Sequence, residues 1–336
     1  MLPFIDEILK HDSLSIVGLE KNTGKTECLK YVLDNLPLDR KHIAVTSIGI
    51  DGETVDQVTR TQKPEIALRP GMYFGTSEMH YRQRRLVSEL IDVSDETTSL
   101  GRVVTARALT GGKILLSGPS SAYSLRRWMD EMHRHGIDLV IIDGALSRLS
   151  SASPAVSQSM ILATGAAYSA NINTLVQKTA HVVDLVNMEL TSPDNIARLS
   201  PIDKGVWFID DEGNLHDLNA LTSLSQEIHF DGVERCVTLY VAGALVGTFL
   251  EKVRQHKSLK HVELVVRDFT KVFATPQQYK LFLKAGGRMT VLQRSKLIAV
   301  TVNPTSPSGY VLDSDTLCDR LSEAIGLPVY DLLKNN

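Results

Sequence analysis

The sequence has no apolar run that approaches the about 20 residues needed for a membrane-spanning helix. Its three cysteines, Cys28, Cys236 and Cys318, are far apart and lack the spacing of metal ligands, which is typical of a protein in a reducing cytosol. The net charge of -3 gives no general attraction to nucleic acid or to anionic membranes. The first residues, MLPFIDEILKHD, carry acids where a signal peptide would carry basic residues. We therefore expect a cytoplasmic protein with no nucleic-acid or membrane partner, and we leave open whether it forms a homo-oligomer.

Short apolar segments alternate with amphipathic ones in the first half of the chain. The predicted strands are 14–18, 42–48, 113–117, 139–142 and 160–163, and predicted helices begin at Lys25 and near Ala170. Continuous apolar strands separated by helices are typical of a mostly parallel sheet that is covered on both faces, so we expect an α/β fold. The polar residues between about 51 and 110 are expected to form an insertion of loops and helix outside the core.

A second series of elements follows residue 230 and indicates a smaller α/β domain. Its predicted strands are 237–242, 261–267, "MTVL", "LIAVTV" and "PVYDLL", and its predicted helices are 243–254, 276–285 and 315–325. Between the two series, "GVWFIDDEGNLHDLN" alternates and turns like a hairpin at Asp211, Glu212 and Gly213. We therefore predict a first domain at 1–205, a hairpin-like linker at 206–231 and a smaller α/β domain at 232–336.

The segment "SIVGLEKNTGKTECLKYVL" nearly matches the phosphate-binding pattern Gly-x-x-x-x-Gly-Lys-[Ser/Thr]. The pattern requires a glycine at position 19, where this chain has Leu19, and Gly18 comes one place too early. The segment nonetheless follows a predicted strand and opens a predicted helix. Gly24 would let backbone N–H groups approach an anion, Lys25 would reach the terminal phosphates of a nucleotide, and Thr26 would ligate Mg²⁺. The alternative is a lysine-rich turn that only caps the helix.

A phosphate loop also predicts an acidic side chain at the end of another strand of the sheet. Asp143 directly follows the strand predicted at 139–142, and we expect it to hold Mg²⁺, although a turn or helix cap is the alternative. Asp51, in "TSIGIDGE", is a candidate for contact with Mg²⁺ or water, but Asp-Gly is also a common turn. Ser120 and Ser121 follow another predicted strand, and we expect them to cap the next helix rather than bind a ligand. "VNPTSPSGY" ends a later strand and is a candidate ligand or partner loop.

Two resemblances to known families extend these predictions. The strings "EKNTGKT" and "DLVIIDG" resemble the P-loop NTPase class that includes dethiobiotin synthetase and the accessory GTPases of guanine-dinucleotide cofactors. A narrower resemblance covers nearly the whole chain. "VGLEKNTGKT", "TSLGRVVTARAL", "IIDGALSR", "ILATGAAYSANI", "LIAVTVNPTSPSGY" and "GLPVYDLL" are similar to the smaller subunit of the reactivating factor for adenosylcobalamin-dependent lysine aminomutases.

The narrower resemblance implies that the protein uses ATP and Mg²⁺, together with an ATPase partner subunit, to help replace damaged cobalamin in an aminomutase. It implies nucleotide contacts at Lys21, Asn22, Thr23, Gly24, Lys25 and Thr26, with Asp143 at the metal. Together with the arguments from the residues themselves, the predicted nucleotide-binding residues are these six and Glu27, the predicted metal ligands are Thr26 and Asp143, and the predicted catalytic residues are Lys25 and Asp51. Glu27 departs from the pattern of P-loop proteins, which often have a second hydroxyl residue at this position. The carboxylate of Glu27 interacts favourably with the helix dipole in the first turn, but it adds negative charge near the phosphates.

Three functions are therefore open. The first is a Mg²⁺-dependent, ATP-binding accessory protein that acts on a partner. The second is an ATP-dependent ligase or kinase of cofactor biosynthesis, similar to dethiobiotin synthetase, in which Asp51 and residues 117–121 would line a small acceptor site. The third is a scaffold that binds nucleotide without hydrolysing it. No motif distinguishes ATP from GTP.

Overall fold

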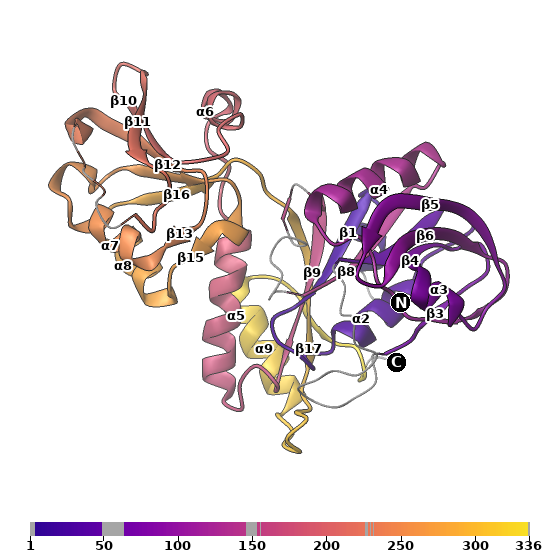
Figure 1. The fold of residues 1–336 in the computed structure, drawn as a ribbon. Helices are drawn as coiled ribbons and strands as arrows, with labels where there is room; N and C mark the ends of the chain where they lie inside the picture. Colours follow the sequence, from indigo (N-terminus) through magenta and orange to yellow (C-terminus); the bar gives the residue numbers. More distant parts are fainter. Residues whose placement is uncertain are drawn as a thin grey trace. The chain divides into compact units, whose positions relative to one another are not determined.

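The computed structural model describes residues 4–48, 64–145, 153–154, 156–225, 228, 230 and 232–334. The chain divides into two compact units (Figure 1). The first consists of Met1–Ala180 together with Ser295–Asn336, and the second of His181–Arg294. Within the described residues, no helix is both long enough and apolar enough to cross a bilayer.

The first unit is built on a large sheet to which nine of the described strands contribute. In spatial order they are β18 (Val329–Asp331), β17 (Lys296–Asn303), β9 (Ser159–Gly165), β1 (Ser13–Gly18), β8 (Leu139–Ala145), β2 (Ile43–Ser47), β4 (Tyr73–Ser77), β6 (Gly101–Ala108) and β5 (Ser88–Thr98). All neighbours from β18 to β4 are parallel, whereas β6 is antiparallel to both β4 and β5. The expectation of an α/β fold with a mostly parallel sheet is confirmed.

Helices cover both faces of this sheet. They are α1 (Phe4–Ile8), α2 (Lys25–Asn35), α3 (Glu78–Arg82), α4 (Ala122–Arg134), α9 (Ser314–Ile325) and the first part of α5 (Ile172–Val186). Ile43 and Val45 of β2 belong to the apolar cluster that contains α1 and α2, whereas Ala44 between them belongs to the cluster that contains Trp128 of α4. Coverage on both faces explains why β1, β2 and β9 are buried along their whole length.

The first part of the insertion expected at about 51–110 lies outside the described residues, and residues 64–110 do not form loops and helix outside the core. Instead, β4, β6 and β5 extend the large sheet beyond β2, and only the short helix α3 lies between them. Every residue of β5, whose sequence is SELIDVSDETT, is at least partly exposed because this strand lies at the edge of the sheet. Its four acids interrupt the alternation that would identify a strand, and charged residues are a common feature of edge strands.

The strand expected at 113–117 also differs in the structure. β7 (Gly112–Ile114) pairs antiparallel with β3 (Ile66–Leu68) in a separate small sheet, while β4 takes the place beside β2. Ile114 and Leu116 are buried, so the apolar run correctly indicated burial. An apolar run does not say which strand its residues pair with, and here it gave the wrong sheet.

The second unit contains a smaller mixed sheet. In spatial order its described strands are β11 (Leu215–Ala220), β10 (Val206–Asp210), β12 (Cys236–Val241), β14 (Glu263–Val266) and β16 (Arg288–Val291), and β13 (Leu245–Val246) pairs separately with β15 (Val272–Phe273). Its helices include α6 (Pro193–Leu199), α7 (Gly247–Gln255) and α8 (Pro276–Lys284), with short 3-10 turns at Val233–Arg235, Lys257–Leu259 and Phe269–Lys271. β12, β14 and β16 are parallel, whereas β10 is antiparallel to β11 and β12.

The hairpin expected near residue 211 is present, but it is part of this sheet rather than a linker. Its turn is held by the Asp210 carboxylate, which lies 2.8 Å from His216 Nε2 and accepts hydrogen bonds from the backbone N–H groups of Asn214 (2.7 Å) and Glu212 (3.0 Å). The contact with His216 makes the largest contribution, and together these hydrogen bonds hold the pKa of Asp210 well below its usual range. The charged residues of this turn therefore have a structural role.

The boundaries of the two units differ from the sequential division 1–205, 206–231 and 232–336. The chain returns to the first unit after Arg294, where β17 pairs with β9. The elements after it, α9 and β18, also belong to the first unit. The residues of β17, KLIAVTVN, are mostly buried, as expected for a strand inside a parallel sheet. Such a strand suits either sheet equally well, so the order of predicted elements does not reveal the return of the chain to the first unit.

Candidate functional site

The loop Gly18–Thr26 connects the central strand β1 to helix α2. Asn22 (φ 62°) and Gly24 (φ 89°) both have left-handed backbone conformations, which asparagine and glycine adopt most readily. Gly24 occupies the N-cap position directly before the first helical residue, and a glycine has no side chain with which to cap the helix. The first N–H groups of a helix have no partner within it, and they carry the positive end of the helix dipole. The loop therefore offers backbone donors at a helix N-terminus.

The unusual position of the first glycine has a local explanation. Leu19 is 5% exposed, and its N–H donates to the carbonyl of Ala163 in β9 at 2.9 Å, so the strand pairing continues one residue beyond β1. A side chain at Gly18 would place its Cβ 2.9 Å from Thr23 Oγ1. The Thr23 hydroxyl in turn donates to the Glu20 carbonyl at 2.8 Å and closes the loop on itself. Glycine is therefore needed at position 18, where the loop folds back, and not at position 19.

Lys25 and Asp143 meet beside this loop. Their Nζ and Oδ1 atoms are 2.8 Å apart, and the two side chains are 25% and 18% exposed. The contact follows from the sheet order, because β1 and β8 are parallel neighbours and Ile16 is in register with Asp143. The structure thus brings together the first residue of α2 and an acid near the carboxyl end of β8, which are remote in the sequence.

The other predicted residues of the segment differ in their surroundings. Thr26 is half-buried in the first turn of α2, and Lys21 and Asn22 are exposed. Glu27 is also exposed and forms an ion pair of 2.8 Å with Lys30 one turn along the helix. This pairing partly offsets the negative charge that Glu27 brings to the first turn. Asp51, predicted to act in catalysis, lies outside the described residues.

The serines after β7 do not form an open site. Ser121 caps helix α4, because its hydroxyl accepts a hydrogen bond of 3.0 Å from the Ser124 N–H. Ser117 is fully buried, and its Oγ lies 2.7 Å from both His80 Nδ1 and Ser77 Oγ. The expectation that Ser121 caps a helix is confirmed, and Ser117 belongs to a buried polar cluster that ties β4 to the segment after β7.

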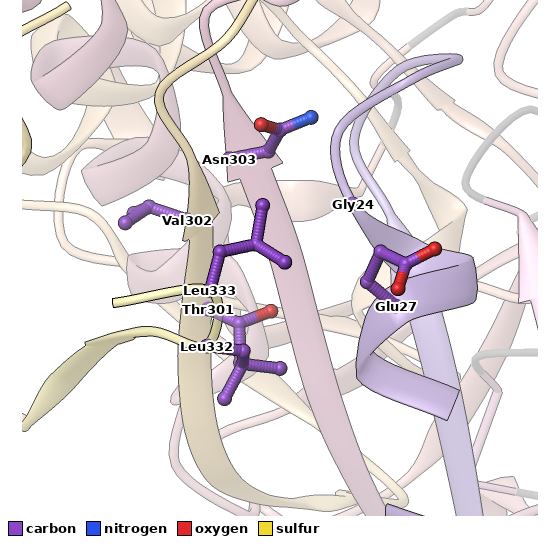
Figure 2. Close-up of a pocket in the computed structure, with 7 residues that line it drawn as sticks. All are labelled: Gly24, Glu27, Thr301, Val302, Asn303, Leu332 and Leu333. Carbon is purple, nitrogen blue, oxygen red and sulfur yellow. The ribbon is translucent and has the colours of Figure 1, made fainter. Parts of the chain in front are cut away.

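The end of β17 lies against the loop Gly18–Thr26, a contact that the sequence did not predict. Figure 2 shows Asn303 at the end of this strand, beside Gly24. A small pocket between them has a volume of about 30 Å³ and is lined by Gly24, Glu27, Thr301, Val302, Asn303, Leu332 and Leu333. This volume corresponds to about one water molecule. A pocket of this size is too small to hold a nucleotide. The only sequence signal for this contact was the loop "VNPTSPSGY", which begins here.

The loop and Asp143 of β8 together carry donors of the kind that bind a cation shared with an anionic ligand. Among the described residues, no group of three or more His, Cys, Asp or Glu side chains is placed to hold a metal ion. Mg²⁺ typically binds one or two protein oxygens and completes its shell with phosphate and water. The Asp143 carboxylate and the Thr26 hydroxyl are two such oxygens, and Lys25 beside Asp143 supplies a cation for phosphate. The residues present therefore fit a Mg²⁺–phosphate group.

Comparisons of the chain with protein-family models, with curated proteins and with solved structures found no match.

Proposed function

We propose that the loop Gly18–Thr26 binds the phosphates of a nucleoside triphosphate, with ATP as the expected nucleotide, together with Mg²⁺. The observation that supports this proposal most directly is the 2.8 Å contact between Lys25 and Asp143. It lies next to a loop with left-handed residues at Asn22 and Gly24, and the helix that follows has a glycine at its N-cap position. Cation, acid and backbone donors occur together here at the carboxyl end of a parallel sheet, where ligands of α/β proteins usually bind.

Each residue has a definite chemical role in this proposal. Lys25 neutralises Asp143 when no phosphate is present, and it exchanges this partner for phosphate oxygens when nucleotide binds. The Asp143 carboxylate and the Thr26 hydroxyl then hold Mg²⁺. When bound, Mg²⁺ would offset charge on the phosphates. The backbone N–H groups at the start of α2 donate to phosphate oxygens, which the positive end of the helix dipole also favours.

An Asp143→Asn variant tests the metal part of the proposal. We expect the wild-type protein to bind ATP at least about tenfold more tightly with Mg²⁺ than with EDTA, because an Mg²⁺-bridged carboxylate becomes favourable only when the ion is present. The variant should lose this difference while still binding metal-free ATP, since its Lys25 is no longer engaged by an anion. Isothermal titration of ATP with and without Mg²⁺ measures both quantities.

Asp130→Asn is the matched control, because Asp130 is an exposed acid on α4 and is not part of the loop or of the proposed metal site. This control should retain the full effect of Mg²⁺. A wild-type protein that binds ATP equally well with Mg²⁺ and with EDTA, or an Asp143→Asn variant with an unchanged Mg²⁺ effect, would contradict the assignment of Asp143.

The narrower proposal concerns what the nucleotide is used for, and its support is the sequence resemblance alone. We propose an accessory protein that, together with an ATPase partner subunit, restores an adenosylcobalamin-dependent aminomutase after its cofactor is damaged. In a test, inactivated aminomutase, adenosylcobalamin, the partner subunit, Mg²⁺ and ATP are combined with and without this protein, and aminomutase activity is followed.

Recovery that requires both ATP and this protein is the expected result. Phosphate release that depends on a small acceptor, with no protein partner, would instead indicate a ligase or kinase. Nucleotide binding without turnover and without recovery of the aminomutase would indicate a scaffold. Either of these results would replace the accessory function while leaving the phosphate site in place.

A further inference from the structure

We propose that Asn303, at the end of β17, is a positioning residue that sets the backbone conformation of the loop Gly18–Thr26. Its importance for ligand binding rests on the phosphate site proposed above. Asn303 does not belong to the loop, to the predicted nucleotide contacts or to the metal ligands. It is separated from the loop by more than 270 residues of sequence, but its side chain lies against the two left-handed residues of the loop.

The first contact fixes one peptide group of the loop. Asn303 Nδ2 donates a hydrogen bond of 3.0 Å to the carbonyl oxygen of Asn22, whose φ is 62°. In a trans peptide, the C=O of one residue and the N–H of the next point in opposite directions. A bond that holds the Asn22 carbonyl toward β17 therefore directs the Thr23 N–H away from β17. The orientation of a backbone donor in the loop thus depends on a side chain of another strand.

The second contact limits how the loop can pack. A Cβ at Gly24 would lie 3.0 Å from the Asn303 Cβ, which is closer than nearly all real contacts of this kind. Gly24 also has φ 89°, a value that disfavours any side chain. The loop therefore approaches β17 as closely as it does only because position 24 is glycine. Asn303 and Gly24 together define the distance between the loop and the strand end.

Asn303 is itself held firmly from two sides. Its side-chain oxygen accepts a hydrogen bond of 3.1 Å from the Thr305 N–H, so the side-chain NH₂ group is the part left to face Asn22. Its backbone carbonyl accepts a hydrogen bond of 2.8 Å from the Ala166 N–H, just beyond β9. A side chain fixed in this way can transmit the position of the sheet to the loop, whereas a freely rotating one could not.

Two substitutions test the role of Asn303. Asn303→Leu is similar in size and removes the donor to Asn22, and Asn303→Asp removes the donor while keeping the acceptor for Thr305. The first readout is amide hydrogen exchange of the segment 19–28 in the nucleotide-free protein. We expect exchange in this segment to be about fivefold faster in both variants, because one net hydrogen bond is lost. Exchange in β2 should stay unchanged.

The second readout is the affinity for Mg·ATP. We expect the affinity to fall about fivefold in Asn303→Leu, because part of the binding free energy must then be used to order the loop. Thr305→Val is the matched control, since its exposed side chain is adjacent to Asn303 and has no role in this argument. It should leave both readouts as in the wild type.

The outcomes separate this inference from the proposed function. Loop exchange that is unchanged in both variants, or that rises equally in β2, overturns the positioning role. If the wild-type protein fails to bind Mg·ATP, the proposed phosphate site is wrong, but selective acceleration of exchange at 19–28 still supports the contact between Asn303 and the loop. If the wild type binds Mg·ATP and Asn303→Leu accelerates loop exchange without weakening binding, Asn303 does not position the loop for phosphate.

Discussion

Replacement of Lys25 by alanine is expected to weaken Mg·ATP binding about a hundredfold. A hydrogen bond to a charged group contributes ~1.5–3 kcal/mol, and each 1.4 kcal/mol changes the dissociation constant tenfold. Lys25 is the cation that the structure places beside the loop and Asp143, and it is only one-quarter exposed, so bulk water screens it less than a surface lysine. The dissociation constant, measured by isothermal titration for both proteins, checks this expectation.

The matched control is Lys30→Ala. Lys30 lies on the same helix and forms an ion pair with Glu27, but it does not contact Asp143. Its replacement should leave affinity within about twofold, because exposed ion pairs of this kind contribute little. Thermal unfolding of both variants shows whether each is folded before binding is compared. Equal affinities for the wild type and a folded Lys25→Ala variant would remove the main support for the phosphate site.

Replacement of Gly165 by alanine is expected to destabilise the protein by about 3 kcal/mol. Gly165 is the last residue of β9, and a Cβ there would lie 2.1 Å from the carbonyl oxygen of Asn303 in β17. The obstructing atom belongs to the backbone, so it cannot be moved aside by a change of side-chain rotamer. Overpacking in a well-packed interior costs ~1–3 kcal/mol, and a backbone clash belongs at the upper end of that range. The midpoint of urea unfolding measures the loss.

Gly111→Ala provides the comparison. Gly111 is exposed in the same unit, and its nearest contact would be the Leu68 carbonyl at 3.8 Å, an ordinary distance. This substitution should change stability by less than about 0.5 kcal/mol, as is usual for surface positions. If Gly165→Ala and Gly111→Ala unfolded at the same urea concentration, the close contact between β9 and β17 would not exist in the protein.

Part of this fold and of the candidate site could be predicted from the sequence because local patterns determine it. β1, β2, β8 and β9 are continuous apolar runs, and burial on both faces of a parallel sheet produces such runs. The apolar run 139–142 predicts Asp143 near the loop, and although β8 extends past Asp143 to Ala145, its pairing with β1 places this acid 2.8 Å from Lys25. Leu19 appeared to break the motif, but its N–H continues the pairing with β9.

The rest depends on contacts between segments that are remote in the sequence. β5 is partly exposed and acidic, so no apolar alternation identifies it. β17 would suit either sheet, and its choice of β9 as a partner is a property of packing rather than of its own residues. Asn303 belongs to the candidate loop "VNPTSPSGY", but its contact with the loop Gly18–Thr26 could not be predicted for the same reason. An asparagine at the end of a strand carries no signal until the fold places the carbonyl of Asn22 3.0 Å from its side chain.

Because β17 belongs to the first sheet, that sheet and the loop Gly18–Thr26 can be completed only late in synthesis, after the second unit has been made. The loop Gly18–Thr26 is synthesised before the second unit, whereas Asn303 is added only after the whole of His181–Arg294 has been made. Until then, β9 has no β17 beside it, and the carbonyl of Asn22 lacks its partner. Pairing of distant segments is also a slow part of folding, since a long loop must close. A nascent chain therefore contains every residue of the motif well before it contains the strand that supports the loop.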